Sequence, residues 1–79
     1  MFETNDTALA AYLVCVGYES KKYRWQGNRC FIAFEISPGL LQHVQTMSDG
    51  KALVDPRQFN MRIRVLKAEM HARRGLGGY

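Results

Sequence analysis

The fold is decided by residues 18–36 of this 79-residue chain, YESKKYRWQGNRCFIAFEI. They contain two extended runs, Tyr18–Trp25 and Arg29–Ile36, which are separated by Gly27-Asn28. Glycine at the first of two central positions favours a type II′ turn, because the twist of that turn matches the twist of the flanking strands. The stretch therefore predicts an antiparallel β-hairpin.

The two-residue turn also predicts the register of the hairpin. The opposed pairs should be Trp25 with Cys30, Tyr23 with Ile32, and Lys21 with Phe34. Since side chains alternate along a strand, one face is predicted to belong to the core: Tyr23, Trp25, Cys30, Ile32, Phe34 and Ile36. The other face is predicted to be basic with a single phenylalanine: Ser20, Lys22, Arg24, Phe31, Ala33 and Glu35.

A helix should precede the hairpin. Thr4 is a suitable N-cap and Asp6 places an anion in the first turn, where the helix dipole favours it. Apolar residues then recur at helical spacing and Gly17 supplies a stop, so a helix is expected over about Asn5–Val16.

Two further helices should follow, each opened by a capping residue and a proline. Ser37-Pro38 starts the first, which should end at Asp49-Gly50. Its apolar stripe is Leu40, Leu41, Val44 and Met47. Asp55-Pro56 starts the second, whose narrow core stripe is Phe59, Ile63, Leu66 and Met70. The fold class is therefore predicted to be α+β: a helix, a β-hairpin and two more helices.

The domain boundaries follow from the same pattern. Residues 1–74 are expected to form a single compact domain, because chains of this size rarely hold two independent cores. Residues 75–79, GLGGY, are expected to form a flexible glycine-rich tail. Lys51–Val54 is extended, and is interpreted either as a link or as a short third strand that uses Ala52 and Val54.

Positive charge is concentrated in two segments. Residues 57–79 carry six cations against the single carboxylate of Glu69, and residues 19–30 carry four against Glu19. On the last helix, at about 100° per residue, six side chains fall within one arc beside the core stripe: Arg57, Asn60, Arg64, Lys67, His71 and Arg74. Arginine, lysine and asparagine in this arrangement suit phosphates and base edges. The alternatives are a docking surface for an acidic partner protein and an ordinary solvated face.

The hairpin offers a second, smaller candidate surface. Its outer face would present Lys22, Arg24 and Phe31, and cations mixed with aromatic rings bind nucleic-acid backbones and stack bases. The competing interpretation is that the lysines and arginines protect a sheet edge against unwanted pairing.

Several other functions are not expected from the sequence. His43 and His71 have no Cys or carboxylate at ligand spacing, so we expect no metal site and no cofactor. No Ser/His/Asp or Cys/His arrangement points to an enzyme. The Gly75–Gly78 stretch follows a helix, so it cannot cradle phosphates as a P-loop does.

The expected location is the cytoplasm. The longest apolar stretch, Ala8–Val16, is far shorter than the roughly 20 residues of a membrane span, and the N-terminus lacks the basic region of a signal peptide. Cys15 and Cys30 lie in apolar runs and are interpreted as structural thiols in a reducing compartment.

Five short pieces between residues 4 and 68 carry a family resemblance. They are Thr4-Asn5-Asp6, Leu9-Ala10-Ala11-Tyr12-Leu13, Cys30-Phe31-Ile32-Ala33-Phe34-Glu35, Asp55-Pro56-Arg57-Gln58-Phe59 and Arg64-Val65-Leu66-Lys67. Their order resembles a small prokaryotic and phage family known only as a domain of unknown function. The resemblance implies a compact helix–hairpin–helix–helix domain in a phage or mobile-element setting, and it implies no activity. The extension with His71, Arg73 and Arg74 departs from that pattern.

Two functional hypotheses follow. The first is a small accessory protein that binds DNA or RNA through the basic face of the last helix. The second is a non-enzymatic interaction module, such as a phage inhibitor or adaptor of an acidic host protein. A homodimer is also expected, in which Phe31 and the helix after Ser37 complete a core that is small for one chain.

Overall fold

The hairpin forms two strands of a three-stranded antiparallel sheet in the computed structural model, which describes residues 1–77. Strand β2 (Ser20–Gln26) pairs with β3 (Arg29–Phe34), and β3 also pairs with β1 (Phe2–Thr4), so the strand order is β1-β3-β2. Gly27 has φ +61°, and no residue other than glycine in the described chain has positive φ. These values fit the predicted type II′ turn.

The predicted register is correct near the turn and wrong at its far end. Trp25 lies opposite Cys30 and Tyr23 opposite Ile32, as expected. Beyond Lys22 the register shifts, so that Ser20, rather than Lys21, pairs with Phe34. An extra residue in one strand produces such a β-bulge. The bulge turns Ser20 toward the core face, where its hydroxyl lies 3.0 Å from the Tyr23 hydroxyl.

The third strand lies in a different segment from the one proposed. Lys51–Val54 forms no strand, and β1 uses Phe2–Thr4 instead, with Phe2 opposite Phe34 and Glu3 opposite Ala33. Pairing with β1 places Phe2 against the core cluster and covers the edge of β3 that β2 leaves open. Ile36, predicted on the core face, lies beyond the end of β3 and is 52% exposed.

Helix α1 (Thr7–Cys15) begins two residues later than predicted, because its N-cap is Asp6 and not Thr4. The Asp6 carboxylate accepts hydrogen bonds from the backbone N–H groups of Ala8 and Leu9, at 3.0 and 3.2 Å. Thr4 closes β1, and its hydroxyl accepts from the N–H of Asp6 at 3.0 Å. The anion thus satisfies the free N–H groups at the helix start directly.

The two later helices begin where the cap-and-proline signals predict. In α2 (Pro38–Ser48) the Ser37 hydroxyl accepts from the N–H of Leu40 at 3.1 Å. In α3 (Pro56–Gly77) the Asp55 carboxylate accepts from the N–H of Arg57 at 3.0 Å. The predicted tail begins inside α3, which continues to Gly77, while Gly78 and Tyr79 lie outside the described residues.

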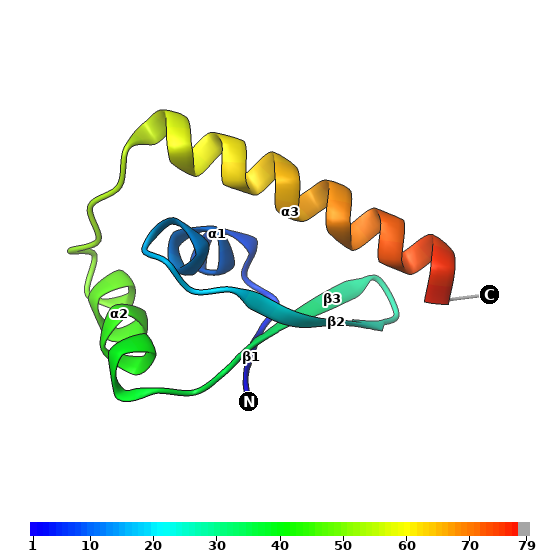
Figure 1. The fold of residues 1–79 in the computed structure, drawn as a ribbon, viewed down its shortest axis with the longest axis horizontal. Coiled ribbons are helices and arrows are strands. Elements are labelled where there is room, and N and C mark those ends of the chain that lie inside the picture. The colour runs from blue at the N-terminus through cyan, green and yellow to red at the C-terminus, as the bar shows by residue number, and fades with distance from the viewer. Residues whose placement is uncertain (78–79) are drawn as a thin grey trace.

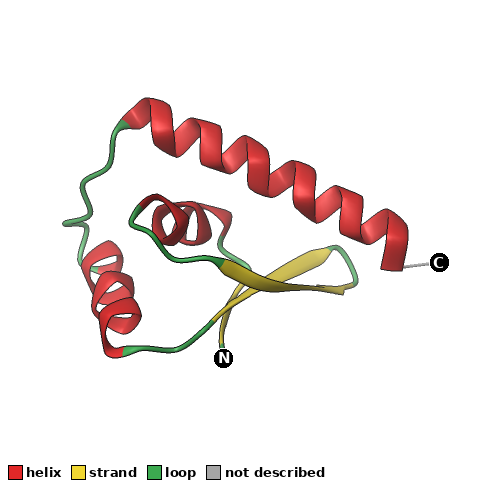
Figure 2. Cartoon of the chain, in the orientation of Figure 1, coloured by secondary structure: helices red, strands yellow, loops and turns green. Residues whose placement is uncertain are grey.

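The helices α1 and α3 cover one face of the sheet, and α2 lies at the end of the molecule away from the hairpin turn (Figures 1 and 2). One hydrophobic cluster joins these elements. Its fully buried side chains are Leu13, Ile32, Phe34 and Leu40, and Leu66 of α3 packs with them. The predicted core stripe of α3 is confirmed, since Phe59, Ile63 and Met70 pack against the same cluster. No helix within residues 1–77 has both the length and the apolar character needed to cross a membrane.

Candidate nucleic-acid interface

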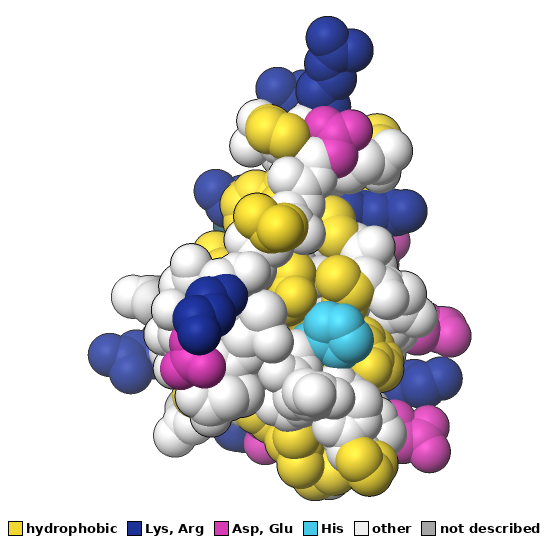
Figure 3. Space-filling model, turned by 90° about the vertical axis from the view of Figure 1, so that its left-hand side faces the viewer, with side chains coloured by type: hydrophobic (Ala, Val, Ile, Leu, Met, Phe, Trp, Pro, Cys, Tyr) yellow, Lys and Arg dark blue, Asp and Glu magenta, His cyan; other side chains and the backbone are white. Residues whose placement is uncertain are grey.

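One exposed flank of α3, beside its core stripe, is basic. Leu66 is buried, whereas Arg57, Asn60, Arg64 and Lys67 are all exposed. We call these four residues the basic side of α3. They come into line because the helix turns by about 100° per residue. Figure 3 shows the molecule from the side where α2 lies. Lys and Arg side chains stand at the top of this view, toward α3, and apolar side chains run down its middle.

The cations of the basic side have no ionic partners in the described chain. The ion pairs within residues 1–77 are Lys21–Glu19, Arg24–Glu3 and Arg73–Glu69, and none of them involves Arg57, Arg64 or Lys67. The first turn of α3 also contains no acidic residue. A cation in the first turn is opposed by the helix dipole, so Arg57 lies where helix stability alone would favour an anion.

The last predicted residue of the ridge, Arg74, contacts the hairpin. Its guanidinium lies 4.5 Å from the centre of the Trp25 ring, and it donates hydrogen bonds to Asn28 Oδ1 at 3.2 Å and to the Gly27 carbonyl at 3.5 Å. Such a stacked cation is attracted by the ring quadrupole. Arg74 is therefore half-buried and attaches α3 to the hairpin turn.

Arg73 and Met70 reinforce this attachment. The Arg73 guanidinium lies 4.6 Å over the Tyr23 ring and 3.2 Å from Glu69. The Trp25 indole N–H donates to the Met70 carbonyl at 3.0 Å. We call these contacts of Arg73, Arg74 and Met70 with β2 the arginine clamp. Sequence reasoning missed it, although Tyr23 and Trp25 were correctly assigned to the face of β2 that α3 covers.

The clamp brings the two basic segments of the sequence together. The hairpin turn and the C-terminal half of α3 lie side by side at one end of the molecule (Figure 1). The exposed His71 ring is 6.3 Å from the Trp25 ring, and Arg29 at the start of β3 is also exposed. His71 thus adjoins the hairpin and extends the basic side toward it.

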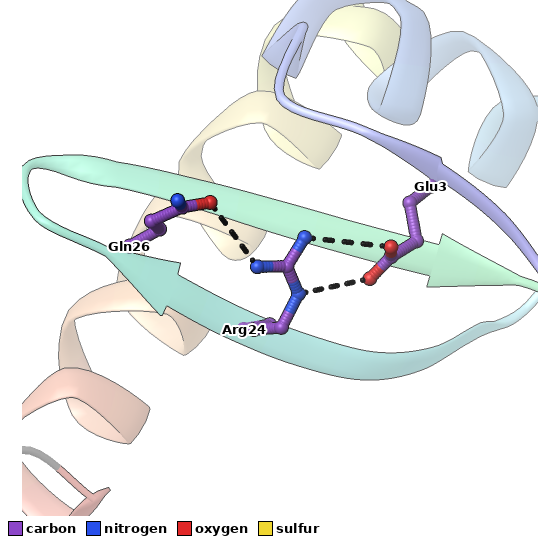
Figure 4. A network of polar contacts seen from close by, with 3 residues as sticks. All are labelled: Glu3, Arg24 and Gln26. Carbon is purple, nitrogen blue, oxygen red and sulfur yellow. Dashed lines mark hydrogen bonds and ion pairs between the residues drawn. The ribbon is translucent and has the colours of Figure 1, made fainter.

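The outer face of the sheet is a separate surface. The Arg24 guanidinium lies 4.6 Å from the centre of the Phe31 ring. It forms a bidentate contact with the Glu3 carboxylate, in which Nε donates to Oε2 at 3.3 Å and Nη2 donates to Oε1 at 3.4 Å. Figure 4 shows Arg24 between Glu3 and Gln26, with helices behind the sheet. Glu3 offsets the charge of Arg24, which leaves Lys22 as the one predicted cation of this face without an ionic partner in residues 1–77. The structure therefore does not join Lys22, Arg24 and Phe31 to the basic side of α3.

The opposite flank of α3 contains Arg62, which the sequence did not single out. Two open clefts of about 300 and 270 Å³ lie on either side of it, between α3 and the segment from α1 to β2. Its Nε atom is buried without a hydrogen-bond partner in the described residues. Cys15 lines the larger cleft, and burial raises the pKa of its thiol, with Arg62 opposing and Asp55 reinforcing that shift.

The other thiol and the histidines offer no site of their own. Burial also raises the pKa of Cys30, so neither cysteine is a low-pKa nucleophile. His43 Nδ1 lies 2.8 Å from the Gly39 carbonyl, a contact that requires the nitrogen to donate, and its ring packs against Tyr18. Within residues 1–77, no three His, Cys, Asp or Glu side chains are grouped closely enough to hold a metal ion.

The predicted dimer surface is smaller than the sequence suggested. Leu40 is fully buried in the core of its own chain, and Val44 and Met47 are half-buried against that core, so of the predicted stripe only Leu41 is exposed. Phe31, the other predicted dimer contact, is half-buried under Arg24.

Comparisons with protein-family models, with curated proteins and with solved structures found no match to this chain. The resemblance to a domain of unknown function therefore stays a prediction. What the fold defines is a small α+β protein with one long, exposed, basic helix.

Proposed function

We propose that this protein is a small, non-enzymatic accessory protein that binds nucleic acid through the basic side of α3. The observation that carries the proposal is that Arg57, Arg64 and Lys67 are exposed on one side of a 22-residue helix with no ionic partner in the described chain. A phage or mobile-element setting is proposed on the family resemblance alone.

The charge pattern of α3 favours a ligand over a purely solvated face. Solvated helices commonly gain stability from acid–base pairs at i,i+4 spacing. Among the described side chains of α3 one such pair exists, Arg73–Glu69, and its arginine belongs to the arginine clamp. The basic side has no such pair, and its first cation faces the positive end of the helix dipole. An anionic ligand would supply the missing negative charge to these cations and would also offset the unfavourable position of Arg57 in the first turn.

An acidic protein partner is the alternative, and one observation favours it. Met61 and Val65 are 48% and 47% exposed on α3, next to the basic side. Apolar side chains beside cations are common in protein interfaces. Asn60 favours the nucleic acid, because a side-chain amide between arginines can bond to a base edge.

Direct titration tests the proposal. The folded protein would be titrated with a DNA duplex, a single DNA strand and an RNA duplex at roughly 50 and 200 mM salt, with polyglutamate as the acidic-protein control. We expect binding to at least one nucleic acid that weakens steeply with salt, and weaker binding to polyglutamate. Failure to bind any nucleic acid at low salt, with the circular dichroism spectrum of a folded protein, would refute the proposal.

A further inference from the structure

We infer that the nucleic acid is B-form duplex DNA and that α3 enters its major groove. This inference rests on the proposed function and concerns the same side of α3. It is carried by two observations: the aromatic rings beside the basic segments are covered, and the basic side belongs to a long regular helix on the outside of the molecule.

The covered rings argue against a single strand as ligand. Proteins that bind single strands stack bases on open aromatic rings beside their cations. Every Phe, Tyr and Trp side chain in residues 1–74 is buried or half-buried. The three rings nearest the basic segments each carry an arginine on one face: Phe31 under Arg24, Tyr23 under Arg73 and Trp25 under Arg74. A base would have to displace a guanidinium in order to stack.

The shape of α3 fits the major groove of DNA. With 22 residues at about 1.5 Å each, the helix is about 33 Å long, and the groove is about 12 Å wide, enough to admit an α-helix. No other element lies outside α3 in Figure 1. The exposed Ala68 and Ala72 lie beside the basic side and, being small, let the helix axis approach the groove floor. The deep, narrow major groove of an RNA duplex does not admit a helix in this way.

The order of residues along α3 suits a division between bases and phosphates. Asn60 and Arg64 are one turn apart, so their side chains point to the same place in the groove. The Asn60 amide can bond to adenine and the Arg64 guanidinium to guanine. Arg57 and Lys67 lie on either side of this pair and are positioned for the phosphates that flank the groove.

Three probes of one sequence test the inference. Fluorescence anisotropy would compare a DNA duplex of about 20 base pairs, roughly twice the length of α3, with an unstructured single DNA strand and with the matching RNA duplex. We expect the DNA duplex to bind tighter than either by about tenfold or more. Dimethyl sulfate footprinting would then show protection of guanine N7, in the major groove, and not of adenine N3, in the minor groove.

The outcomes separate this inference from the proposed function. Equal or tighter binding of the single strand or of the RNA duplex would overturn the assignment to duplex DNA and leave nucleic-acid binding standing. Protection of adenine N3 alone would overturn the major-groove placement. Absence of binding to all three probes by the folded protein would overturn the proposed function, and this inference with it.

Discussion

Gly39, in the first turn of α2, faces the hydroxyl of Tyr18. A Cβ atom at position 39 would lie 2.8 Å from that oxygen, which is itself 3.3 Å from His43 Nδ1. The next atom of the ring, Cζ, would be 4.0 Å away, an ordinary contact distance. The fit of α2 against the α1–β2 connection therefore depends on one hydroxyl group.

A double-mutant cycle tests this contact. Replacing glycine with alanine in a helix stabilises it by up to about 1 kcal/mol. We expect Gly39→Ala to lose this gain in the native background, where the methyl group meets the Tyr18 hydroxyl, and to recover it in the Tyr18→Phe background. Urea unfolding of the four proteins gives the coupling free energy. Equal effects of Gly39→Ala in both backgrounds would contradict the geometry.

Arg74 and Arg64 are arginines of the same helix with different predicted roles. Arg74→Ala removes a stacked cation, worth about 0.5–1 kcal/mol, and two hydrogen bonds, so we expect about 1 kcal/mol of lost stability and a red shift of Trp25 fluorescence. Arg64→Ala, the matched control, should change the free energy of unfolding by less than about 0.5 kcal/mol. Comparable losses for the two variants would show that the arginine clamp does not exist in solution.

The two thiols give a prediction about pH. Burial raises the pKa of Cys15 and Cys30 above the ordinary value of 9.0, because the folded chain disfavours the thiolate. The folded state then holds more protons than the unfolded one at alkaline pH, so this contribution to stability is complete below 9.0 and is lost as the pH rises above it. Alkylation rates followed by mass spectrometry should show inflections above 9.0 for both folded thiols.

The urea-unfolded chain is the control for the thiol measurement. Both cysteines should there show inflections near the ordinary value. A folded-state inflection at or below 9.0 would mean that the thiols are reactive and that their assignment as structural residues is wrong.

Among the elements, those with local signals could be predicted from the sequence. The hairpin turn follows from Gly27-Asn28, and α2 and α3 begin at a capping residue followed by proline. The three-residue strand β1 could not be predicted, because Phe2–Thr4 is too short to show a pattern and its partner β3 lies about 30 positions away in the chain. The bulge at Lys21 was missed for a related reason: nothing in residues 20–22 marks an extra residue.

In the candidate site, too, some residues could be placed from the sequence and others could not. The exposed positions of Arg57, Asn60, Arg64 and Lys67 follow from helical periodicity and could be predicted. The roles of Arg73 and Arg74 depend on how the end of α3 meets β2, a contact between residues more than 40 positions apart. Glu3 could not be matched to Arg24 until β1 was known to flank β3.

Helix α2 carries the prediction of a homodimer. If two chains associate through it, the contact must centre on Leu41, which is 47% exposed. Sedimentation equilibrium at tens of micromolar protein should then give twice the chain mass of 9.1 kDa. Leu41→Glu should return the mass to that of one chain, because a buried carboxylate without a partner is costly. A single-chain mass for the native protein would refute the dimer.

At the scale of the whole molecule, some cations are engaged by other described side chains of the chain, whereas those on the basic side of α3 are not. On the outer face of the sheet the charge of Arg24 is offset by Glu3, and at the end of α3 Arg73 and Arg74 contact the hairpin. Arg57, Arg64 and Lys67, all on the basic side of α3, have no ionic partner in the described residues. The proposed function depends on these three charges acting on DNA, Arg57 and Lys67 on phosphates and Arg64 on a base edge.

The salt dependence of DNA binding tests that claim most directly. Each neutralised phosphate contributes about −0.9 to the slope of log affinity against log salt, so the two phosphate contacts of Arg57 and Lys67 predict a slope of about −1.8. The Arg64→Ala/Lys67→Ala variant should bind more weakly, with a slope of about −0.9. The control Lys21→Ala/Lys51→Ala removes the same net charge from exposed positions outside α3 and should keep the native slope. A slope unchanged by the α3 substitutions, or reduced equally by the control, would contradict binding through the basic side of α3.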